Sequence, residues 1–233
     1  MVKETKHQIQ TIGIIMDGNR RWAERQGLAK LAGHRRGAEK LREVLEWSRT
    51  AGVETLIVYA FSTENWRRAK TEVNFLFKLF RRFLKTEVDS LIANKTIFRC
   101  LGDRAALPTD LQSDIALMEA RTSGLGPQTL AIAVSYGGRA EIVAAAKVFA
   151  KRYHGKLDTA RESDFSQCLF TFGLPDPDLI IRTGGEERLS NFLPWQSVYS
   201  ELYFTPTYWP ALTHKEFLVI LKEVADRDRR FGR

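Results

Sequence analysis

An aspartate, a glycine and two arginines stand together in the segment MDGNRRW, which begins at Met16. Gly18 lets the backbone approach an anion, and amides at the start of a following helix point at phosphate oxygens. Arg20 and Arg21 add charge-assisted hydrogen bonds to such oxygens. Asp17 fits beside this positive charge when Mg²⁺ lies between, because Mg²⁺ takes one or two carboxylates together with substrate phosphates. The alternative is an Asp-Gly turn before a solvated basic helix.

A second polar cluster, FSTENWRR, begins at Phe61. Ser62 and Asn65 offer neutral hydrogen-bonding groups, and Arg68 offers a contact for an anion. The alternative makes the serine and threonine the cap of a short helix, with Glu64 in its first turn and the tryptophan in the core. The segment taken alone leaves both interpretations open.

A third cluster, RTGGEERLSNF, begins at Arg182. Its two glycines, two arginines and one serine are the components of a cradle for a diphosphate. Further along, Glu201 stands among aromatic residues. Such an isolated acid is either an exposed surface residue or the second carboxylate of a metal site.

Each of these clusters follows a predicted strand. Apolar, β-branched runs predict strands at Thr11–Met16, Thr55–Phe61, Ile97–Leu101, Leu130–Ser135 and Leu179–Arg182. Helical spacing predicts helices at Gly37–Arg49, Val73–Val88, Pro108–Thr122, Ala140–Tyr153 and His214–Asp228. The alternation predicts one α/β domain over residues 1–233, with a mostly parallel central sheet that is flanked by helices and covered on both faces. Ligands of such sheets bind beyond the carboxyl ends of the strands, where the three clusters lie.

Composition restricts the compartment and the partners. The 233 residues begin with a polar segment, contain no apolar run of about 18 residues and have only Cys100 and Cys168. These features predict a cytoplasmic protein without a disulfide framework. The net charge of +8 indicates a polyanionic partner: nucleic acid, an acidic membrane or a diphosphate.

Together the motifs resemble the undecaprenyl diphosphate synthase (cis-prenyltransferase) family. The matching segments are MDGNRRWA, GHRRGA, YAFSTENW, SYGGR, RTGGEERLSNFLPWQ, SELYF and the final Arg230-Phe231-Gly232. The resemblance implies an Mg²⁺-dependent transferase that adds isopentenyl diphosphate to an allylic prenyl diphosphate such as farnesyl diphosphate. It implies a long, undecaprenyl-like cis-polyprenyl diphosphate as product, used as a lipid-carrier precursor.

The resemblance also assigns roles to individual residues. Asp17 and Glu201 are implied to hold Mg²⁺, and Asp17 and Asn65 to be catalytic. The residues implied to lie around the allylic diphosphate are Gly18, Asn19, Arg20, Arg21, Lys30, His34 and Arg68. Those implied for isopentenyl diphosphate are Arg182, Arg188 and Ser190. The other implied substrate contacts are Ser62, Thr63, Glu64 and Leu189, with Trp22 and Trp66 shaping the pocket.

Two departures from the family pattern bear on these roles. Lys30 stands where many members have arginine, which keeps the charge but loses the bidentate fork. Glu187 stands where some bacterial members have histidine, so we leave it out of the site.

A growing prenyl chain needs an apolar tunnel. The resemblance implies that Phe75, Phe77, Phe80 and Phe83 line it together with Ala38, Ala60 and Val134. The alternative is that this aromatic stripe is ordinary core. The sequence has no Asp-Asp-x-x-Asp cluster, so we do not expect an all-helical trans-prenyltransferase.

The expected assembly is a homodimer of a self-sufficient enzyme, since the motif residues lost in partner-only family members are present. Nucleic acid is not expected, because the arginines accompany glycines at strand ends rather than one helix face. The basic runs Arg81-Arg82 and Arg227–Arg230 are interpreted as solvated surface. They also fit a peripheral contact with acidic lipid head groups.

Overall fold

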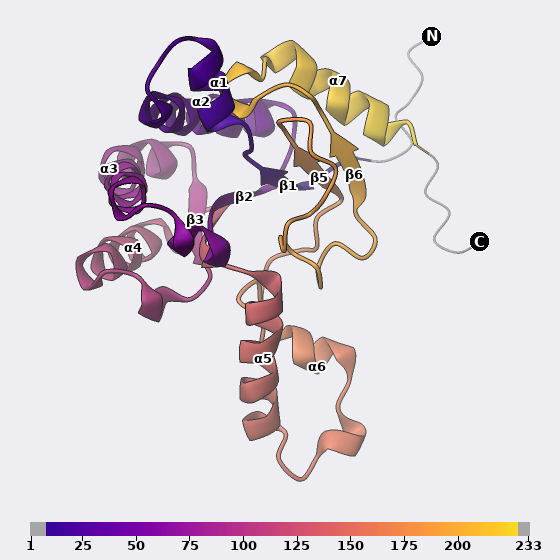
Figure 1. Ribbon diagram of the computed structural model, residues 1–233. Coiled ribbons are helices and arrows are strands. Elements are labelled where there is room, and N and C mark those ends of the chain that lie inside the picture. Colours follow the sequence, from indigo (N-terminus) through magenta and orange to yellow (C-terminus); the bar gives the residue numbers. More distant parts are fainter. Residues whose placement is uncertain (1–7, 228–233) are drawn as a thin grey trace.

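Residues 8–227 are described here from a computed structural model of the chain (Figure 1). Six parallel strands form one sheet in the order β3-β4-β2-β1-β5-β6. The strands are β1 Thr11–Ile15, β2 Thr55–Ser62, β3 Thr96–Leu101, β4 Gln128–Tyr136, β5 Leu179–Arg182 and β6 Glu201–Phe204. The helices are α1 Asn19–Arg25, α2 Lys30–Thr50, α3 Lys70–Ala93, α4 Thr109–Thr122, α5 Gly138–Arg152, α6 Glu162–Ser166 and α7 His214–Ala225. Short 3-10 turns include Thr63–Arg67 and Trp209–Ala211.

The central strands are apolar on both sides, as parallel strands covered on two faces must be. Every residue of β1 is buried, and so is every residue of β5. β1 pairs with β2 on one side and with β5 on the other. Strands β2 to β4 lie on the first side of β1 and β5 and β6 on the second, so the strand order reverses at β1. Such a switch point opens a crevice at the carboxyl ends of the strands.

Helices α2, α3, α4 and α7 pack on one face of the sheet. Their apolar side chains share a core with Ile12 and Ile14 of β1 and with Leu130 and Ile132 of β4. The opposite face is covered mainly by an irregular segment after β5, whose Phe192 and Leu193 are fully buried against the strands. The sheet is therefore flanked by helices and covered on both faces, as expected, with bulky side chains of a loop filling the second face.

Helices α5 and α6 project away from the sheet (Figure 1). They pack on each other through Phe149 and Phe165, whose ring centroids lie 5.5 Å apart. Most of the remaining α5 surface is exposed, including Val143 and Val148. Within residues 8–227, no helix is both long and apolar enough to cross a bilayer.

The predicted strands all form, with bounds that differ by at most two residues. The helix expected from Gly37 begins earlier, at Lys30, and α3 extends beyond its predicted ends to Lys70 and Ala93. Helix α1 and strand β6 were not predicted. The predicted end of the last helix at Asp228 and the motif at residues 230–232 lie outside the described residues.

Candidate active site

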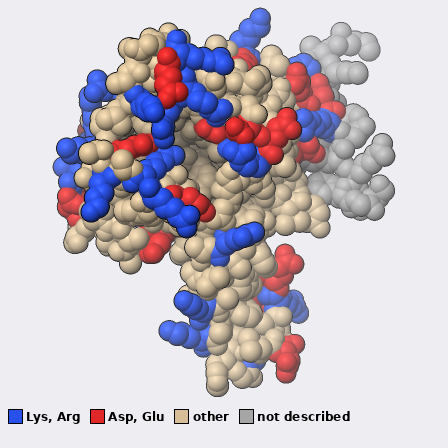
Figure 2. Space-filling view, in the orientation of Figure 1, with Lys and Arg blue, Asp and Glu red and all other residues tan. Residues whose placement is uncertain are grey.

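A cavity of about 790 Å³ opens at the carboxyl ends of β1, β2 and β5. All three polar clusters of the sequence contribute to its walls, as expected of strand-end loops in a parallel sheet. Figure 2 shows a hollow in this face with Lys and Arg side chains around it, interspersed with acidic ones. The cavity therefore has the size and charge of a site for a small polyanion.

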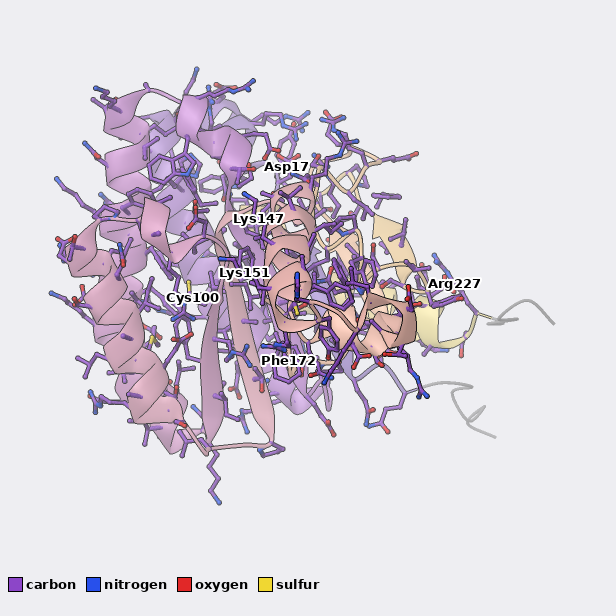
Figure 3. All side chains as sticks on the ribbon, turned by 90° about the horizontal axis from the view of Figure 1, so that it is seen from below. Asp17, Cys100, Lys147, Lys151, Phe172 and Arg227 are labelled. Atoms are coloured by element: carbon purple, nitrogen blue, oxygen red, sulfur yellow. The ribbon has the colours of Figure 1, made fainter. Side chains whose placement is uncertain are left out.

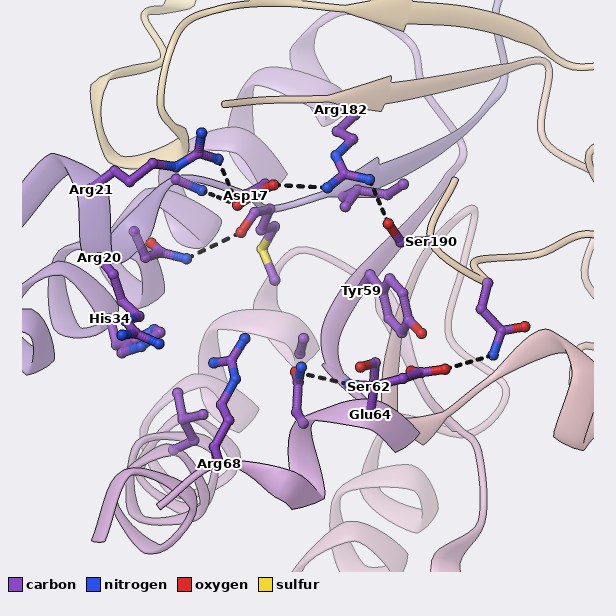
Figure 4. A pocket seen from close by; sticks show the side chains of 18 of the residues that line it. Asp17, Arg20, Arg21, His34, Tyr59, Ser62, Glu64, Arg68, Arg182 and Ser190 are labelled. Carbon is purple, nitrogen blue, oxygen red and sulfur yellow. Dashed lines mark hydrogen bonds and ion pairs between the residues drawn. The ribbon is translucent and has the colours of Figure 1, made fainter. Parts of the chain in front are cut away.

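The Asp17 carboxylate lies at the centre of the site (Figure 4). Its Oδ2 accepts a hydrogen bond from Arg182 Nη2 at 2.9 Å, and its Oδ1 accepts one from the Gly18 amide at 2.6 Å. Arg21 lies 3.1 Å from the same Oδ1. Burial opposes the charge on Asp17, but the hydrogen bond from Arg182 and the charges of both arginines hold its pKa below the ordinary value. Asp17 is therefore ionised at neutral pH.

The backbone around Asp17 is fixed from two sides. The Thr183 hydroxyl and the Trp209 amide both donate to the Asp17 carbonyl, at 2.7 and 2.9 Å. Gly18 has a φ of +100°, and a Cβ there would lie 2.6 Å from the Tyr208 ring. Only glycine fits this turn, which starts α1 and points Arg20 and Arg21 at the cavity (Figure 4).

Arg182 connects Asp17 to the loop after β5. Its side chain is only 5% exposed, and its Nη1 donates to Ser190 Oγ at 2.7 Å and to the Arg188 carbonyl at 2.5 Å. Its Nε has no hydrogen-bond partner among the described residues. A buried guanidinium aimed at a loop hydroxyl in this way is suited to hold a phosphate oxygen.

The turn after β2 forms the opposite wall. Ser62 and Asn65 cap it reciprocally, and the Asn65 Oδ1 accepts from the Ser62 amide at 3.1 Å. The helix-cap interpretation of the sequence is thus correct for the backbone, yet both side chains also line the cavity. Glu64 lines it too and accepts a hydrogen bond from Asn191 at 3.0 Å.

Three basic side chains on the remaining wall share one acid that the sequence did not reveal. The Glu72 carboxylate of α3 accepts a hydrogen bond from Arg68 at 2.9 Å. It also contacts His34 at 3.3 Å and Arg20 at 3.8 Å. Burial lowers the pKa of His34, and nearby Arg68 and Arg20 add to this against the opposing charge of Glu72. His34 is therefore neutral at pH 7. Only its helical spacing to Arg68 could have indicated Glu72.

Comparison with known proteins agrees with this geometry. A family profile described as putative undecaprenyl diphosphate synthase matches residues 15–232. An isoprenyl transferase of Thermotoga maritima is 45% identical over 224 residues, with 96% of each chain covered. One from Fusobacterium nucleatum is 47% identical, covering 95% of this chain and 94% of its own. The chain belongs to the undecaprenyl diphosphate synthase family. It is a cis-prenyltransferase, a transferase of prenyl groups that acts on prenyl diphosphates.

Two solved structures agree. Lavandulyl diphosphate synthase from Lavandula x intermedia, in complex with dimethylallyl diphosphate, matches with a TM-score of 0.93 at 35% identity. The alignment covers 97% of this chain and 99% of that one. A probable undecaprenyl diphosphate synthase from Campylobacter jejuni matches with a TM-score of 0.81 at 34% identity, covering 97% and 100%. The cis-prenyltransferase fold therefore extends over nearly the whole chain.

The structure brings most of the residues implied by the family together. Those that line the cavity are Asp17, Gly18, Asn19, Arg20, Arg21, His34, Ser62, Glu64, Asn65, Arg68, Arg182 and Ser190. Those that do not are Trp22, Lys30, Thr63, Trp66, Arg188, Leu189 and Glu201. Lys30 instead pairs with Glu24 at 3.4 Å. Trp66 packs on Phe77 and donates to Ser135 at 3.1 Å.

Glu201 lies away from the cavity within one chain, and its implied role as a metal ligand stays a prediction. It is the first residue of β6 and pairs with Leu179 of β5, which in turn pairs with Ile12 of β1. Asp17 lies beyond the other end of β1, after Ile15. At about 3.3 Å per residue, those three steps alone separate the two by about 10 Å along the strands. Glu201 binds Arg227 at 2.8 Å, and Figure 3 shows Arg227 far from Asp17. Within one chain the two carboxylates therefore cannot hold the same Mg²⁺.

The donor set at Asp17 nevertheless fits Mg²⁺ in another way. Among residues 8–227 no group of three or more acids, histidines or cysteines could enclose a metal. Asp17 offers one ionised carboxylate, 30% exposed, on the cavity wall. Mg²⁺ is commonly bound by one carboxylate plus substrate phosphates and water, which this site permits once a diphosphate enters.

A second, apolar cavity of about 100 Å³ lies between α2, α3 and the sheet. It shares Met16, Ala60 and Leu76 with the polar cavity, so the two adjoin. The residues of the expected tunnel that line it are Ala38, Ala60, Phe77, Phe80, Phe83 and Val134. Phe75 does not line it. An apolar chain starting at the polar site would therefore pass between α2 and α3.

Proposed function

We propose that this cis-prenyltransferase adds isopentenyl diphosphate units to an allylic primer such as farnesyl diphosphate, and makes a long cis-polyprenyl diphosphate of the undecaprenyl type. One observation carries the proposal: a cationic cavity at the strand ends adjoins an apolar cavity between two helices. Such a pair suits a substrate with a diphosphate head and a prenyl tail. We propose further that residues 1–233 act as one catalytic domain.

The allylic diphosphate is assigned to Asn19, Arg20, Arg21, His34 and Arg68, beside the entrance of the apolar cavity. Isopentenyl diphosphate is assigned to Arg182, Arg188 and Ser190. Mg²⁺ held by Asp17 and diphosphate oxygens would supply positive charge to the leaving diphosphate.

In the proposed reaction, the allylic C–O bond breaks and the diphosphate leaves with its electron pair. The arginines of the cavity stabilise the charge that develops on it. The alkene of isopentenyl diphosphate forms the new C–C bond to the allylic carbon. A proton then passes to an oxygen of the released diphosphate beside the turn of Ser62 and Asn65, leaving a cis double bond.

The product could instead be short, and the size of the apolar cavity favours this second candidate. An apolar cavity of 150 Å³ holds a molecule as small as benzene. The 100 Å³ between α2 and α3 is therefore too small for a farnesyl chain unless the side chains that line it move. A short product needs less movement of the lining side chains than a long one.

We also propose a homodimer, with a peripheral contact to membranes of acidic lipids and a cytoplasmic location. Large apolar side chains are exposed on the projecting α5 and α6 region, among them Val143, Val148 and Phe172. Burying them against a second copy would remove apolar surface from water.

The net charge of +8 favours anionic lipid surfaces. Sedimentation, and vesicle flotation with and without phosphatidylserine, test these two proposals.

The deciding experiment is incubation with Mg²⁺, labelled isopentenyl diphosphate and farnesyl diphosphate, with Asp17→Ala as control. A ladder ending at long polyprenyl diphosphates, absent in the control, supports the first candidate. Products that stop after one or two additions support the second. No incorporation with geranyl, farnesyl or geranylgeranyl primers rejects the self-sufficient enzyme.

A further inference from the structure

One amide side chain joins three loops at the rim of the polar cavity. Asn191 follows Ser190 in the loop after β5, and its Nδ2 donates to Glu64 Oε1 at 3.0 Å. Its Oδ1 accepts from the Arg139 amide at the start of α5, at 2.8 Å. The first of these bonds is the dashed line from Glu64 in Figure 4. We call this group of Glu64, Arg139 and Asn191 the clasp.

The backbone of the clasp is strained and closely packed. Ser190 and Asn191 have φ values of +48° and +67°. This is the left-handed region of the backbone, which residues other than glycine and asparagine rarely adopt. The Gly138 amide holds the Asn191 carbonyl at 2.8 Å. A Cβ on Gly137 would lie 2.5 Å from the Thr63 hydroxyl and 2.9 Å from Asn191 Nδ2. The three loops therefore meet too closely to admit another side chain, and strain persists because they fix one another.

The bond between Glu64 and Asn191 spans 127 positions of sequence and joins opposite walls of the cavity. On one side, Glu64 belongs to the turn capped by Ser62 and Asn65. On the other side, Asn191 follows Ser190, whose hydroxyl accepts a hydrogen bond from Arg182 at 2.7 Å. A change in the length of this bond would thus change the distance between the two walls.

We propose that Asn191 is a positioning residue that sets the distance between the isopentenyl diphosphate cradle and the turn where the proton is lost. This inference rests on the proposed assignment of Arg182 and Ser190. Since Asn191 contacts Glu64 through an N–H donor, its role depends on which partner donates and which accepts, and not only on side-chain volume.

The charge on Glu64 strengthens the clasp. Burial raises the pKa of Glu64, but hydrogen bonds from its own amide and from Asn191, Ser62 and Thr63 outweigh this and hold the pKa below the ordinary value. A hydrogen bond to an ionised carboxylate is about twice as strong as a neutral one. Asn191→Asp would replace that donor with a second carboxylate and push the walls apart.

The test is a reciprocal exchange. Asn191→Asp is expected to lower kcat/KM for isopentenyl diphosphate at least about tenfold, with a smaller change in the KM of the allylic substrate. The double variant Glu64→Gln with Asn191→Asp restores the bond with donor and acceptor exchanged, and is expected to recover most of that loss. Asn94→Asp, an exposed asparagine at the end of α3, is the matched control and is expected to keep wild-type kinetics.

Binding of isopentenyl diphosphate measured by calorimetry in Mg²⁺ buffer tests the same variants without turnover. If wild-type protein binds but does not condense, the proposed function fails, while the order of affinities still decides the role of the clasp. The inference is overturned if the double variant is no better than Asn191→Asp. It is also overturned if Asn191→Ala keeps wild-type affinity and wild-type kcat.

Discussion

The Arg182 guanidinium lies 2.9 Å from the Asp17 carboxylate although the two residues are 165 positions apart. The pairing of β1 with β5 creates this contact, because Ile15 stands beside Arg182 in the sheet. Arg182 is nearly buried while Asp17 is partly open to the cavity. The Asp17 carboxylate therefore faces the cavity, and the buried Arg182 guanidinium behind it balances its negative charge. The carboxylate stands where a diphosphate and its metal would enter.

Asp17→Asn tests the charge of this carboxylate with little change in its shape. We expect kcat to fall by at least about 100-fold, the loss typical of removing one preorganised electrostatic group from a site. The residual rate should no longer depend on Mg²⁺ concentration in the range where wild-type protein responds. Steady-state kinetics across a magnesium titration measure both effects. A variant with near wild-type kcat would remove Asp17 from the mechanism.

His34 makes stability depend on pH. Its pKa is lowered in the folded protein, so the unfolded chain binds the proton more tightly. Its contribution is therefore complete above about pH 6.5, the ordinary pKa of histidine, and is lost as the pH falls through the folded value. We expect His34→Gln to flatten the dependence of unfolding free energy on pH below about pH 6.5. Urea denaturation at several pH values measures it, and equal slopes for both proteins would contradict it.

Glu72→Gln tests whether one acid holds three basic side chains in place. Without its charge, Arg20 and Arg68 repel each other without compensation, so the KM for the allylic diphosphate should rise about tenfold or more. Glu87→Gln is the matched control: it lies on the same helix, is 15% exposed against 16%, and pairs with Arg42 of α2 at 2.7 Å. Only the first variant should change KM in steady-state assays. An equal change of KM in both variants would mean that Glu72 acts only as a structural ion-pair partner.

Phe77→Ala should enlarge the apolar cavity and lengthen the product. The removed ring leaves space that a prenyl chain can occupy, at a stability cost of up to about 3–5 kcal/mol if the helix does not collapse inward. Phe75→Ala on the same helix does not open the cavity and serves as control. Chromatographic sizing of polyprenyl products distinguishes the two. An unchanged product length in Phe77→Ala would place the limiting residue elsewhere.

The sequence predicted the strands and the gathering of their carboxyl-end loops, since alternating β and α patterns impose a parallel sheet. It did not predict β6, whose four residues form a strand only because β5 offers them a free edge. The same omission concealed the register that sets Glu201 level with Ile12, away from Asp17 within one chain. Glu72 and Asn191 were missed because their partners are distant in sequence or depend on loop conformation.

The parallel direction of all six strands makes the two ends of the sheet unequal as sites for engineering. The loops at the amino ends, such as residues 51–54 and 123–127, lie a full strand length from Asp17. Fluorophores, affinity handles or whole inserted domains placed at Gly124 would leave the cavity intact. The same additions at the carboxyl ends would enter it. A library of insertions should therefore divide into active and inactive members according to which end of a strand each one follows.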